Sequence, residues 1–464
     1  MSDATTPQAS ALDQPQFWTL DRIADALGLG PRGPTAISRI STDTRNVRQG
    51  SCFVALKGDT FDAHDFLADA VKNGAAALVV NDSRKAARLG VPVYEVPDTL
   101  TALGLLGRYR RRAWGRPVVG VVGTNGKTST KELLKAALGG AFTVHATVGN
   151  YNNLVGVPLT LFALPDEAEI AVIEMGTNHP GEVEALRVIV EPDIVVLTSI
   201  AEEHLEGLGD LAGVLREEAS GFKDVELAVT PAAQPEVAEA ARPLAKRTIS
   251  AGLDSGDVKP TAWGAEADGQ GWVEYEGTRV RIPLRGVHNT RNAMLAITAA
   301  RQCGVSMAAI AAGIAAMPSP PMRVNFESHG RTTIINDAYN SNPGSARVAL
   351  ELLEHAGKAR QRVAVLGTML EMGEHSDRLH DEVARTALDS PVELIVGVGG
   401  FADALQRVAP GDSRTVSGAD PVSAWDAMRS RLAPDAVILL KGSRGVRLER
   451  LVPMIAEWAN SLHT

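Results

Sequence analysis

A short loop between residues 123 and 128 has the composition of a phosphate-binding site. It reads G-T-N-G-K-T, follows the apolar run VVGVV and precedes the helix-favouring stretch KTSTKELL. Glycines let backbone amides approach phosphate oxygens, and the N-terminus of a following helix adds partial positive charge. Lys127 can neutralise phosphates, and the Thr128 hydroxyl can ligate Mg²⁺. The commonest phosphate loop has a glycine where this chain has Val121, so the loop alone predicts only a nucleotide-phosphate site.

Two further polar side chains follow apolar runs that read as strands. Glu174 lies at the carboxyl end of the apolar run in IAVIEMG, and His204 lies just past the apolar run in IVVLTSIAEEH. Ligands of open parallel sheets sit beyond the carboxyl ends of the strands, and carboxylate oxygens suit Mg²⁺. Taken singly, the glutamate could be a capping residue and the histidine a structural one. Together with the loop, they predict a magnesium site.

The elements that position these residues fall into three blocks, which predict an α/β protein of three domains. We expect a small N-terminal α/β domain over residues 1–113, with a helix at FWTLDRIADALG and strands at CFVAL and AAALVV. We expect a central domain over 114–319 that contains the phosphate loop, and its continuously apolar runs favour parallel strands covered on both faces. The segment GWVEYEGTRVRIPLRG alternates and predicts a hairpin.

The third block, residues 320–464, follows a proline-rich linker candidate. It alternates strand-like runs (TTIIN, RVAVLG, ELIVGVG, AVILLKG) with helical ones, which predicts a second doubly wound, Rossmann-like parallel sheet.

Composition narrows the function classes. The 464 residues carry a net charge of −9, which argues against broad nucleic-acid binding. No apolar run approaches the roughly 20 residues that span a bilayer, so no integral membrane segment is expected, and the polar start does not resemble a secretory signal. Two cysteines, Cys52 and Cys303, exclude a disulfide framework and favour the cytoplasm. The basic run RYRRRAWGR, residues 108–116, is expected to be a solvated helix end.

Several motifs together resemble the Mur ligase family, the ATP-dependent amide ligases of peptidoglycan synthesis. These are GTNGKTST, EMGTNHPGE and HLEGLG. Further segments resemble the branch of the family that adds D-alanyl-D-alanine, and they occur in order along nearly the whole chain: STDTRNVRQGSCFVALKGDTFDAHDF, TVGNYNNLVGVPLTL, GVHNTRNAMLA, NDAYNSNPGSARVAL, LGTMLEMGEHSDRLH and LLKGSRGVRLE.

The resemblance implies a reaction and its reactants. ATP phosphorylates the terminal carboxylate of UDP-N-acetylmuramoyl-tripeptide, and the amine of D-alanyl-D-alanine attacks the acyl phosphate. The products are the UDP-muramoyl-pentapeptide, ADP and phosphate. Mg²⁺ and Lys127 offset the repulsion between the two anions, and the domains align the reactants. We expect a monomer in which domain closure precedes chemistry, because Lys127 and the dipeptide residues lie on different domains.

The resemblance also implies roles for residues at matching positions. The catalytic set is Lys127, Glu174, His204 and Arg323. The nucleotide set is Gly123, Thr124, Asn125, Gly126, Lys127, Thr128, Ser129, His288, Asn289, Asn292, Arg323 and Asp337, with Asn292 at the adenine, Arg323 at the terminal phosphate and Asp337 near the ribose. The uridine nucleotide would contact Ser41, Thr44, Arg45, Lys57 and His64. The muramoyl peptide would face Thr147, Asn150, Asn152 and Asn153. The dipeptide pocket would contain Tyr339, Asn340, Asn342, Pro343 and Ser345. The Mg²⁺ ligands would be Thr128, Glu174, His204 and Glu218.

Glu218 is the main departure from the family pattern. Mur ligases usually carry a carbamylated lysine 14 residues after the histidine that corresponds to His204, and this chain has Glu218 there. We hypothesise that Glu218 supplies a permanent carboxylate, so that carbon dioxide is not needed. The alternative is a surface glutamate, because Glu217 is adjacent and equally acidic.

Three other functions remain open at this stage. A folylpolyglutamate-synthetase-like ligase would typically read G-K-G-S in the loop, where this chain has Lys127-Thr128-Ser129. A sister Mur ligase that adds diaminopimelate or lysine would carry D-N-P-R in the third domain, which is absent from the sequence. A nucleotide-binding regulator with weakened catalysis is the third alternative. The motif NDAYNSNPG favours the D-alanyl-D-alanine branch.

Overall fold

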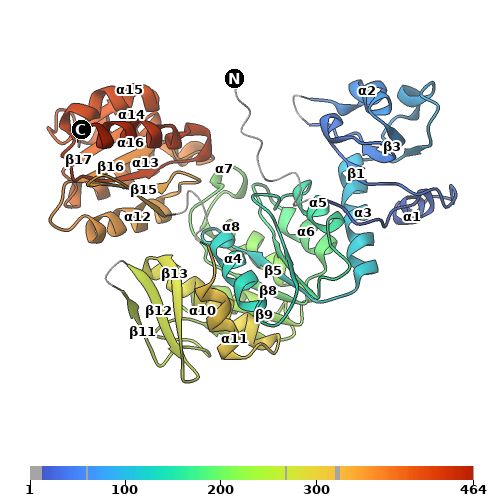
Figure 1. Ribbon diagram of the computed structural model, residues 1–464, viewed down its shortest axis with the longest axis horizontal. Helices are drawn as coiled ribbons and strands as arrows, with labels where there is room; N and C mark the ends of the chain where they lie inside the picture. The colour runs from blue at the N-terminus through green and yellow to red at the C-terminus, as the bar shows by residue number, and fades with distance from the viewer. Residues whose placement is uncertain (1–12, 59–60, 267–268, 319–323, 463–464) are drawn as a thin grey trace.

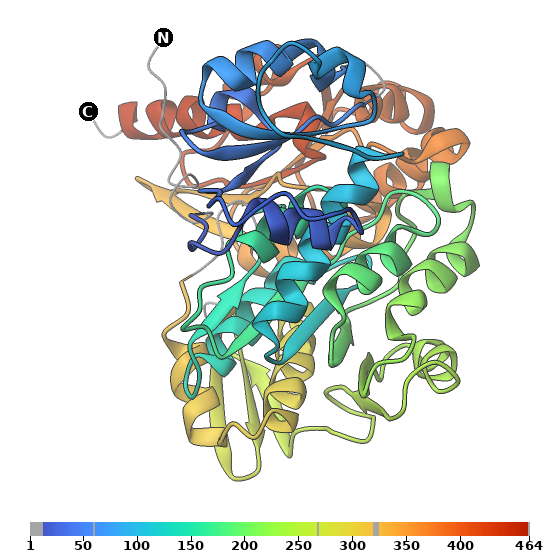
Figure 2. The ribbon, with the colours of Figure 1, turned by 90° about the vertical axis from the view of Figure 1, so that its right-hand side faces the viewer.

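The computed structural model describes residues 13–58, 61–266, 269–318 and 324–462, and it contains three α/β units, each built around its own sheet. Figure 1 shows the N-terminal unit in blue, the central unit in cyan-green to yellow, and the C-terminal unit in orange to red. Figure 2 shows the same arrangement after a quarter turn. Across the described ranges, no helix is long and apolar enough to cross a membrane. The predicted α/β class and three-domain architecture are confirmed.

The N-terminal unit holds a four-stranded parallel sheet in the order β1-β2-β3-β4. Its strands are β1 (Ile40–Ser41), β2 (Ser51–Val54), β3 (Ala75–Val80) and β4 (Val93–Glu95). Its helices are α1 (Leu20–Ala26), α2 (Leu67–Lys72) and α3 (Thr99–Trp114). Side chains alternate across β2 and β3, so one apolar cluster forms on each face of the sheet.

The central unit is built on a six-stranded parallel sheet in the order β10-β9-β8-β5-β7-β6. Its strands are β5 (Val118–Val122), β6 (Val144–Ala146), β7 (Ile170–Glu174), β8 (Ile194–Leu197), β9 (Leu227–Pro231) and β10 (Thr248–Ala251). Every residue of β5 and β7 is buried, as the continuously apolar runs predict for strands covered on both faces. Every residue of β9 is buried too, although the sequence analysis did not predict this strand. The strand order reverses at β5, which places the loop after β5 at the position where ligands of such sheets bind.

Helices cover both faces of this sheet, and a small antiparallel sheet packs beside them. The helices are α4 (Lys127–Leu138), α5 (Gly156–Phe162), α6 (Glu182–Val190), α7 (Leu205–Leu208), α8 (Leu211–Ala219), α9 (Pro235–Ala241), α10 (Val287–Gln302) and α11 (Met307–Ala315). The predicted hairpin is present as β12 (Gln270–Tyr275) and β13 (Thr278–Arg285), and β11 (Ala262–Ala265) adds a third strand that the sequence analysis missed.

The C-terminal unit has six strands in the order β14-β15-β19-β16-β17-β18. The strands are β14 (Asn325–His329), β15 (Thr332–Asp337), β16 (Arg362–Gly367), β17 (Leu394–Val398), β18 (Thr415–Gly418) and β19 (Val437–Lys441). The helices are α12 (Pro343–Ala356), α13 (Ser376–Asp389), α14 (Gly400–Val408), α15 (Pro421–Met428) and α16 (Leu451–Ser461). The predicted parallel sheet is confirmed for β15 to β19, and β14 adds an antiparallel edge.

The basic run does end a helix, α3, and Arg112 and Arg116 are exposed as predicted, but the prediction of a solvated face is wrong for Arg110 and Arg111. Arg110 is 2% exposed and donates to the Leu164 carbonyl, and Arg111 is 8% exposed and donates to the Val190 carbonyl at 2.8 Å. The helix packs against α5 and α6 of the central unit as well as against its own sheet. Two glycines permit this close contact: a Cβ on Gly104 would lie 2.9 Å from the Ile189 side chain, and a Cβ on Gly107 would lie 3.1 Å from Pro158.

Candidate functional site

The loop after β5 is held open by contacts with the segment after β8. The Thr124 amide donates to the Ser199 carbonyl at 2.8 Å, and the Thr124 hydroxyl accepts from the Ala201 amide at 3.1 Å. Gly126 adopts φ +85° and precedes the first turn of α4, whose N-terminus has no side-chain cap. The Lys127 ammonium rests on the carbonyls of Gly123 and Thr124. This arrangement leaves an uncapped helix end and a lysine together, which suits a bound phosphate.

The two adjacent glutamates on α8 have different partners. Glu217 accepts from the amides of Gly181 and Val183 at 2.7 and 2.8 Å, so it caps the start of α6. Glu218 is 2% exposed and accepts from the Gly123 amide at 2.7 Å, directly behind the phosphate loop. Burial raises the pKa of the Glu218 carboxyl, while the nearby Lys127 opposes that rise. The surface-glutamate alternative for Glu218 is therefore wrong.

Thr128 and Glu174 lie together at the carboxyl edge of the central sheet. The Thr128 hydroxyl donates to Glu174 at 3.0 Å, and the Asn152 amide donates to the same carboxylate at 2.9 Å. Glu174 is 2% exposed and has no cationic partner within the described part of the chain. A buried carboxylate among oxygen donors, beside a phosphate loop, suits Mg²⁺, which proteins often hold by one or two carboxylates plus substrate phosphates.

His204 faces the C-terminal unit. Its Nδ1 lies 2.5 Å from Glu371 Oε2, and its Nε2 lies 3.9 Å from Glu203 Oε1. The hydrogen bond from His204 lowers the pKa of Glu371. Among the described residues, no group of three or more His, Cys, Asp or Glu side chains is arranged to hold a metal ion. The metal roles predicted for His204 and Glu218 therefore stay predictions.

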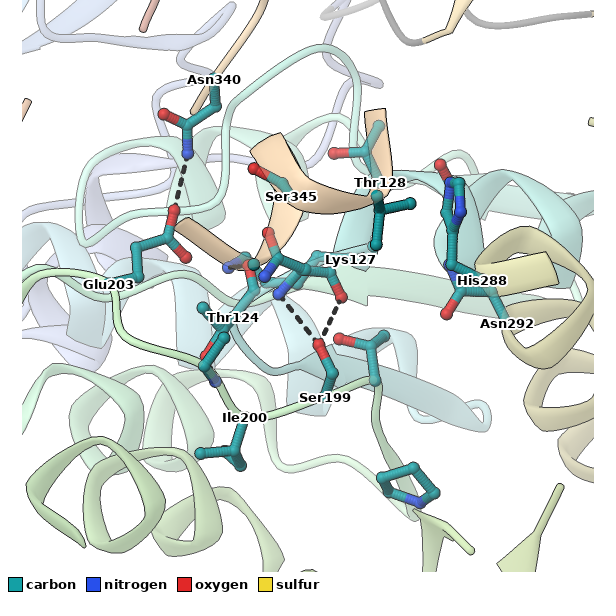
Figure 3. A pocket seen from close by; sticks show the side chains of 18 of the residues that line it. Thr124, Lys127, Thr128, Ser199, Ile200, Glu203, His288, Asn292, Asn340 and Ser345 are labelled. Atoms are coloured by element: carbon teal, nitrogen blue, oxygen red, sulfur yellow. Dashed lines mark hydrogen bonds between the residues drawn. The ribbon is translucent and has the colours of Figure 1, made fainter. Parts of the chain in front are cut away.

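One cavity of about 810 Å³ joins these features to the C-terminal unit. Figure 3 shows labelled side chains from both units around it, including Lys127, Glu203 and Asn340. The predicted site residues that line it are Thr124, Asn125, Gly126, Lys127, Thr128, Ser129, Asn150, Asn152, Asn153, Glu174, His204, His288, Asn289, Asn292, Asp337, Tyr339, Asn340 and Ser345. The phosphate loop, three of the four predicted metal ligands (Thr128, Glu174 and His204) and residues of the predicted dipeptide segment therefore line the same cavity.

Three predicted lining residues instead build the framework of the cavity. Asn342 is fully buried, and its side-chain oxygen accepts from the Ser345 amide at 2.9 Å as the N-cap of α12, with Pro343 in the first turn. The Thr147 hydroxyl accepts from the Glu174 amide at 2.9 Å. Asn342, Pro343 and Thr147 are not in the cavity wall in this structure, and the roles predicted for them with the dipeptide and the muramoyl peptide stay predictions. Arg323 lies outside the described residues.

A second cavity, of about 480 Å³, lies in the N-terminal unit and contains two of the predicted uridine residues, Thr44 and Arg45. Phe61 and Phe66 stack beside it with ring centroids 5.3 Å apart. Ser41 lies close by in sequence, but its hydroxyl donates to the Asp43 carbonyl, and Lys57 is not part of the wall.

His64 makes its contacts within the protein. Its ring is buried, with Nδ1 2.6 Å from Asp62 and Nε2 accepting from the Asn81 amide at 3.1 Å. His64 is not in the wall of the second cavity, and its predicted contact with a uridine nucleotide stays a prediction.

Among the cavity residues that the sequence analysis missed are three charged ones, Glu203, Glu371 and Lys441. Lys441 is 3% exposed and pairs with Asp337 at 3.0 Å. Lys441 could have been found from its position at the end of an apolar strand, the pattern that identified Glu174. Glu203 could have been found because it is adjacent to His204. No sequence pattern pointed to Glu371.

His288 provides a pH-dependent prediction. Burial lowers its pKa to about 4, with Asp337 and Lys441 as opposing charged neighbours. Between pH 6.5 and 4 the unfolded chain therefore binds more protons here, so this residue lowers stability as the pH falls through that window. We expect thermal unfolding temperatures to fall less steeply from pH 6.5 to 4.5 for His288→Gln than for the wild type. Parallel curves would contradict this.

Comparisons with family models match all three units. "Mur ligase family, catalytic domain" matches residues 36–111, "Mur ligase middle domain" matches 121–300, and "Mur ligase, glutamate ligase domain" matches 322–444. The chain is 32% identical over 434 residues to UDP-N-acetylmuramoyl-tripeptide–D-alanyl-D-alanine ligase of Bacillus subtilis, covering 91% of this chain and 94% of that protein. It is 31% identical to the enzyme of that name from Escherichia coli, covering 95% and 98%.

Solved structures give the same correspondence. MurF from Acinetobacter baumannii superposes with a TM-score of 0.86 at 30% identity, covering 96% of this chain and 100% of that one. MurF ligase from Thermotoga maritima, in complex with ADP, superposes with a TM-score of 0.78 at 26% identity, covering 91% and 98%.

Proposed function

The chain belongs to the Mur ligase family, and on that premise we propose that it joins D-alanyl-D-alanine to UDP-N-acetylmuramoyl-tripeptide at the expense of ATP, forming ADP. The observation that carries this proposal is the shared cavity. Its wall combines the phosphate loop of the central domain with Tyr339, Asn340 and Ser345 of the C-terminal domain. The relatives named for this reaction align over more than nine-tenths of the chain.

The first step needs two anions to meet. Lys127 and the uncapped start of α4 would bind the ATP phosphates, so that the tripeptide carboxylate can attack the terminal phosphorus. The Lys127 ammonium would exchange the carbonyls of Gly123 and Thr124 for phosphate oxygens. Arg323 is proposed to reach the terminal phosphate from the C-terminal side. His288, Asn289, Asn292 and Asp337 would hold the nucleoside.

Thr128 and Glu174 would hold Mg²⁺, as their geometry suits it. When bound, the ion supplies charge that offsets the developing negative charge on the phosphates. Asn152 and Thr147 keep the Glu174 carboxylate in place by hydrogen bonds to its side chain and its amide.

The second step joins the amine to the activated carbonyl. Tyr339, Asn340 and Ser345 would hold the dipeptide, while Asn150, Asn152 and Asn153 would face the muramoyl peptide. The neutral amine attacks the acyl-phosphate carbonyl, the nitrogen loses a proton to solvent, and the tetrahedral intermediate collapses as the carbon–oxygen bond to phosphate breaks and phosphate leaves with the electron pair. Thr44 and Arg45, with the Phe61–Phe66 stack, are proposed to hold the uridine nucleotide far from the reacting atoms.

The deciding assay measures phosphate release by the purified protein with ATP, Mg²⁺, UDP-tripeptide and D-alanyl-D-alanine. We expect release to require both cosubstrates. Running it with diaminopimelate- and lysine-containing tripeptides identifies the accepted third residue. Phosphate release that does not depend on both cosubstrates would reject the ligase assignment.

We further propose that Glu218 supplies a carboxylate for Mg²⁺ without carbamylation. Of the two adjacent glutamates, Glu218 alone reaches the phosphate loop, because Glu217 is committed to the start of α6. The cavity wall does not include Glu218, so ligation would require its carboxylate to move from the Gly123 amide.

Glu218→Gln separates the two roles of this residue. The glutamine oxygen can still accept from Gly123, but the charge is lost. We expect the Mg²⁺ concentration for half-maximal rate to rise at least about tenfold, as expected when a charged hydrogen-bonded ligand worth about 1.5–3 kcal/mol is removed. An unchanged Mg²⁺ requirement leaves only the bracing role. Stimulation of the wild type by bicarbonate would also count against the proposal.

Two general properties complete the proposal. We propose a monomer, because one chain supplies the residues around both cavities. A cytoplasmic location stays a prediction from composition, consistent with Cys52 and Cys303 being free thiols.

A further inference from the structure

Glu203 has a buried carboxylate oxygen that lacks a partner. The residue is 4% exposed and lies in the wall of the large cavity. Its Oε1 accepts from the Asn340 side-chain amide at 2.6 Å, and Figure 3 shows the two side chains facing each other across this bond. Its Oε2 is buried without a hydrogen-bond partner among the described residues. A buried, half-satisfied carboxylate is costly unless a ligand completes it.

Two basic side chains near Glu203 and Asn340, those of His204 and Lys441, already pair with other carboxylates. His204 pairs with Glu371 at 2.5 Å, and its nearer approach to Glu203 is 3.9 Å, to the oxygen that Asn340 already occupies. Lys441 pairs with Asp337 and donates to the Asn340 backbone carbonyl. Asn340 therefore contacts Lys441, whose charge is paired, through its backbone carbonyl, and Glu203, whose Oε2 has no hydrogen-bond partner among the described residues, through its side-chain amide.

The position of Glu203 indicates which ligand would complete it. Asn340 belongs to the segment that we propose holds the incoming dipeptide, and Glu203 approaches that segment from the central domain. The dipeptide brings a primary ammonium, the one cationic group among the proposed reactants that must reach the acyl phosphate. A desolvated carboxylate binds such a group strongly and with direction.

We propose that Glu203 is a substrate-binding residue that receives the ammonium of the acceptor dipeptide through Oε2, with Asn340 fixing the carboxylate. This inference rests on the proposed ligase function. It adds a specificity element: acceptors with a charged amino terminus are favoured over neutral ones of the same shape. The contact also assembles only when the central and C-terminal domains lie together.

Glu203→Gln tests this directly, because the glutamine oxygen can still accept from Asn340 while the charge is lost. Glu202→Gln is the matched control, since Glu202 is the adjacent carboxylate and pairs instead with Arg378 at 3.5 Å. We expect Glu203→Gln to raise the KM for D-alanyl-D-alanine at least tenfold, and Glu202→Gln to change it less than twofold.

Hydroxylamine separates amine recognition from the earlier chemistry. It is largely uncharged at pH 8, and its nitrogen attacks the acyl-phosphate carbonyl; the carbon–oxygen bond to phosphate breaks, phosphate leaves with the electron pair, and the nitrogen loses a proton to solvent. We expect the hydroxamate rate from ATP and UDP-tripeptide to be the same within twofold in Glu203→Gln and wild type. That result also shows that the variant is folded.

Each other outcome is decisive. An unchanged KM for the dipeptide overturns the proposal. Equal losses in the dipeptide and hydroxylamine reactions, or a shifted Mg²⁺ requirement for hydroxamate formation, assign Glu203 to the phosphoryl step and also overturn it. Failure of the wild type to form either product rejects the ligase function itself, a result distinct from failure of the Glu203 contact.

Discussion

Lys127→Met is expected to lower D-alanyl-D-alanine-dependent phosphate release by about 10³-fold, the scale seen when a preorganised group that stabilises transition-state charge is removed. Lys127 is the cation of the phosphate loop, at the start of α4, and it rests on loop carbonyls that phosphate oxygens would replace. The methionine keeps the length and apolar stem of the side chain. Steady-state phosphate release at saturating substrates measures the effect.

Lys135→Met is the matched control. Lys135 is exposed on the last turn of the same helix, so the substitution removes the same charge from the same element. We expect its rate to stay within twofold of the wild type, with both variants unfolding at temperatures close to that of the wild type. A Lys127→Met enzyme that keeps more than a tenth of the wild-type rate would refute the assigned role.

Gly123→Ala is expected to lower kcat/KM for ATP by about 10²-fold, the cost of displacing a catalytic loop by about 1 Å. Gly123 has φ +114°, and a Cβ there would lie 2.4 Å from the Thr198 hydroxyl and 2.9 Å from the Thr198 amide. The backbone cannot yield easily, because Thr198 donates to Val122 at 3.0 Å and the Thr124 amide donates to Ser199 at 2.8 Å. The loop must therefore move, and its bond to Glu218 with it.

Gly304→Ala isolates backbone strain from crowding. Gly304 also has positive φ, +84°, but a Cβ there would meet nothing within 4 Å. We expect it to lose stability of about 1–2 kcal/mol, from the left-handed conformation alone, and to keep its activity. Gly123→Ala should lose activity well beyond what its stability loss explains. Equal activities for the two alanine variants would contradict the argument.

The sequence could predict the strands around the phosphate loop because each is buried on both faces and therefore reads as a continuous apolar run. β5 and β7 are such strands. Strands at exposed edges carry no such signal: β14 and β18 mix polar and apolar residues, and their pairing with a neighbour defines them. The same reasoning explains α3, since its arginines look like surface residues until the second domain that accepts their hydrogen bonds is known.

Some residues of the candidate site could be predicted from the sequence and others could not. Thr128 and Glu174 could be placed from sequence, because parallel strands bring their carboxyl ends to one edge. The partners of three other site residues could not be predicted from sequence, because the partners lie on the C-terminal domain. Glu371 pairs with His204, Asn340 with Glu203, and Asn342 with Asn125. Contacts between distant segments depend on how whole domains dock, which local pattern does not encode.

The way α3 is buried bears on how the molecule can move. Trp18 of the N-terminal domain meets Phe162 of α5 edge to face, 5.7 Å apart, and Arg110 and Arg111 anchor the same helix to backbone carbonyls of the central domain. The central and C-terminal domains meet near the phosphate loop through polar contacts such as Asn125 with Asn342. They also share one cluster of buried apolar residues, which includes Leu205 of the central domain and Met369 of the C-terminal domain. We therefore expect the N-terminal and central domains to move as one unit that carries the tripeptide substrate. Moving the C-terminal domain away to exchange nucleotide and dipeptide would break hydrogen bonds and also expose part of this apolar cluster.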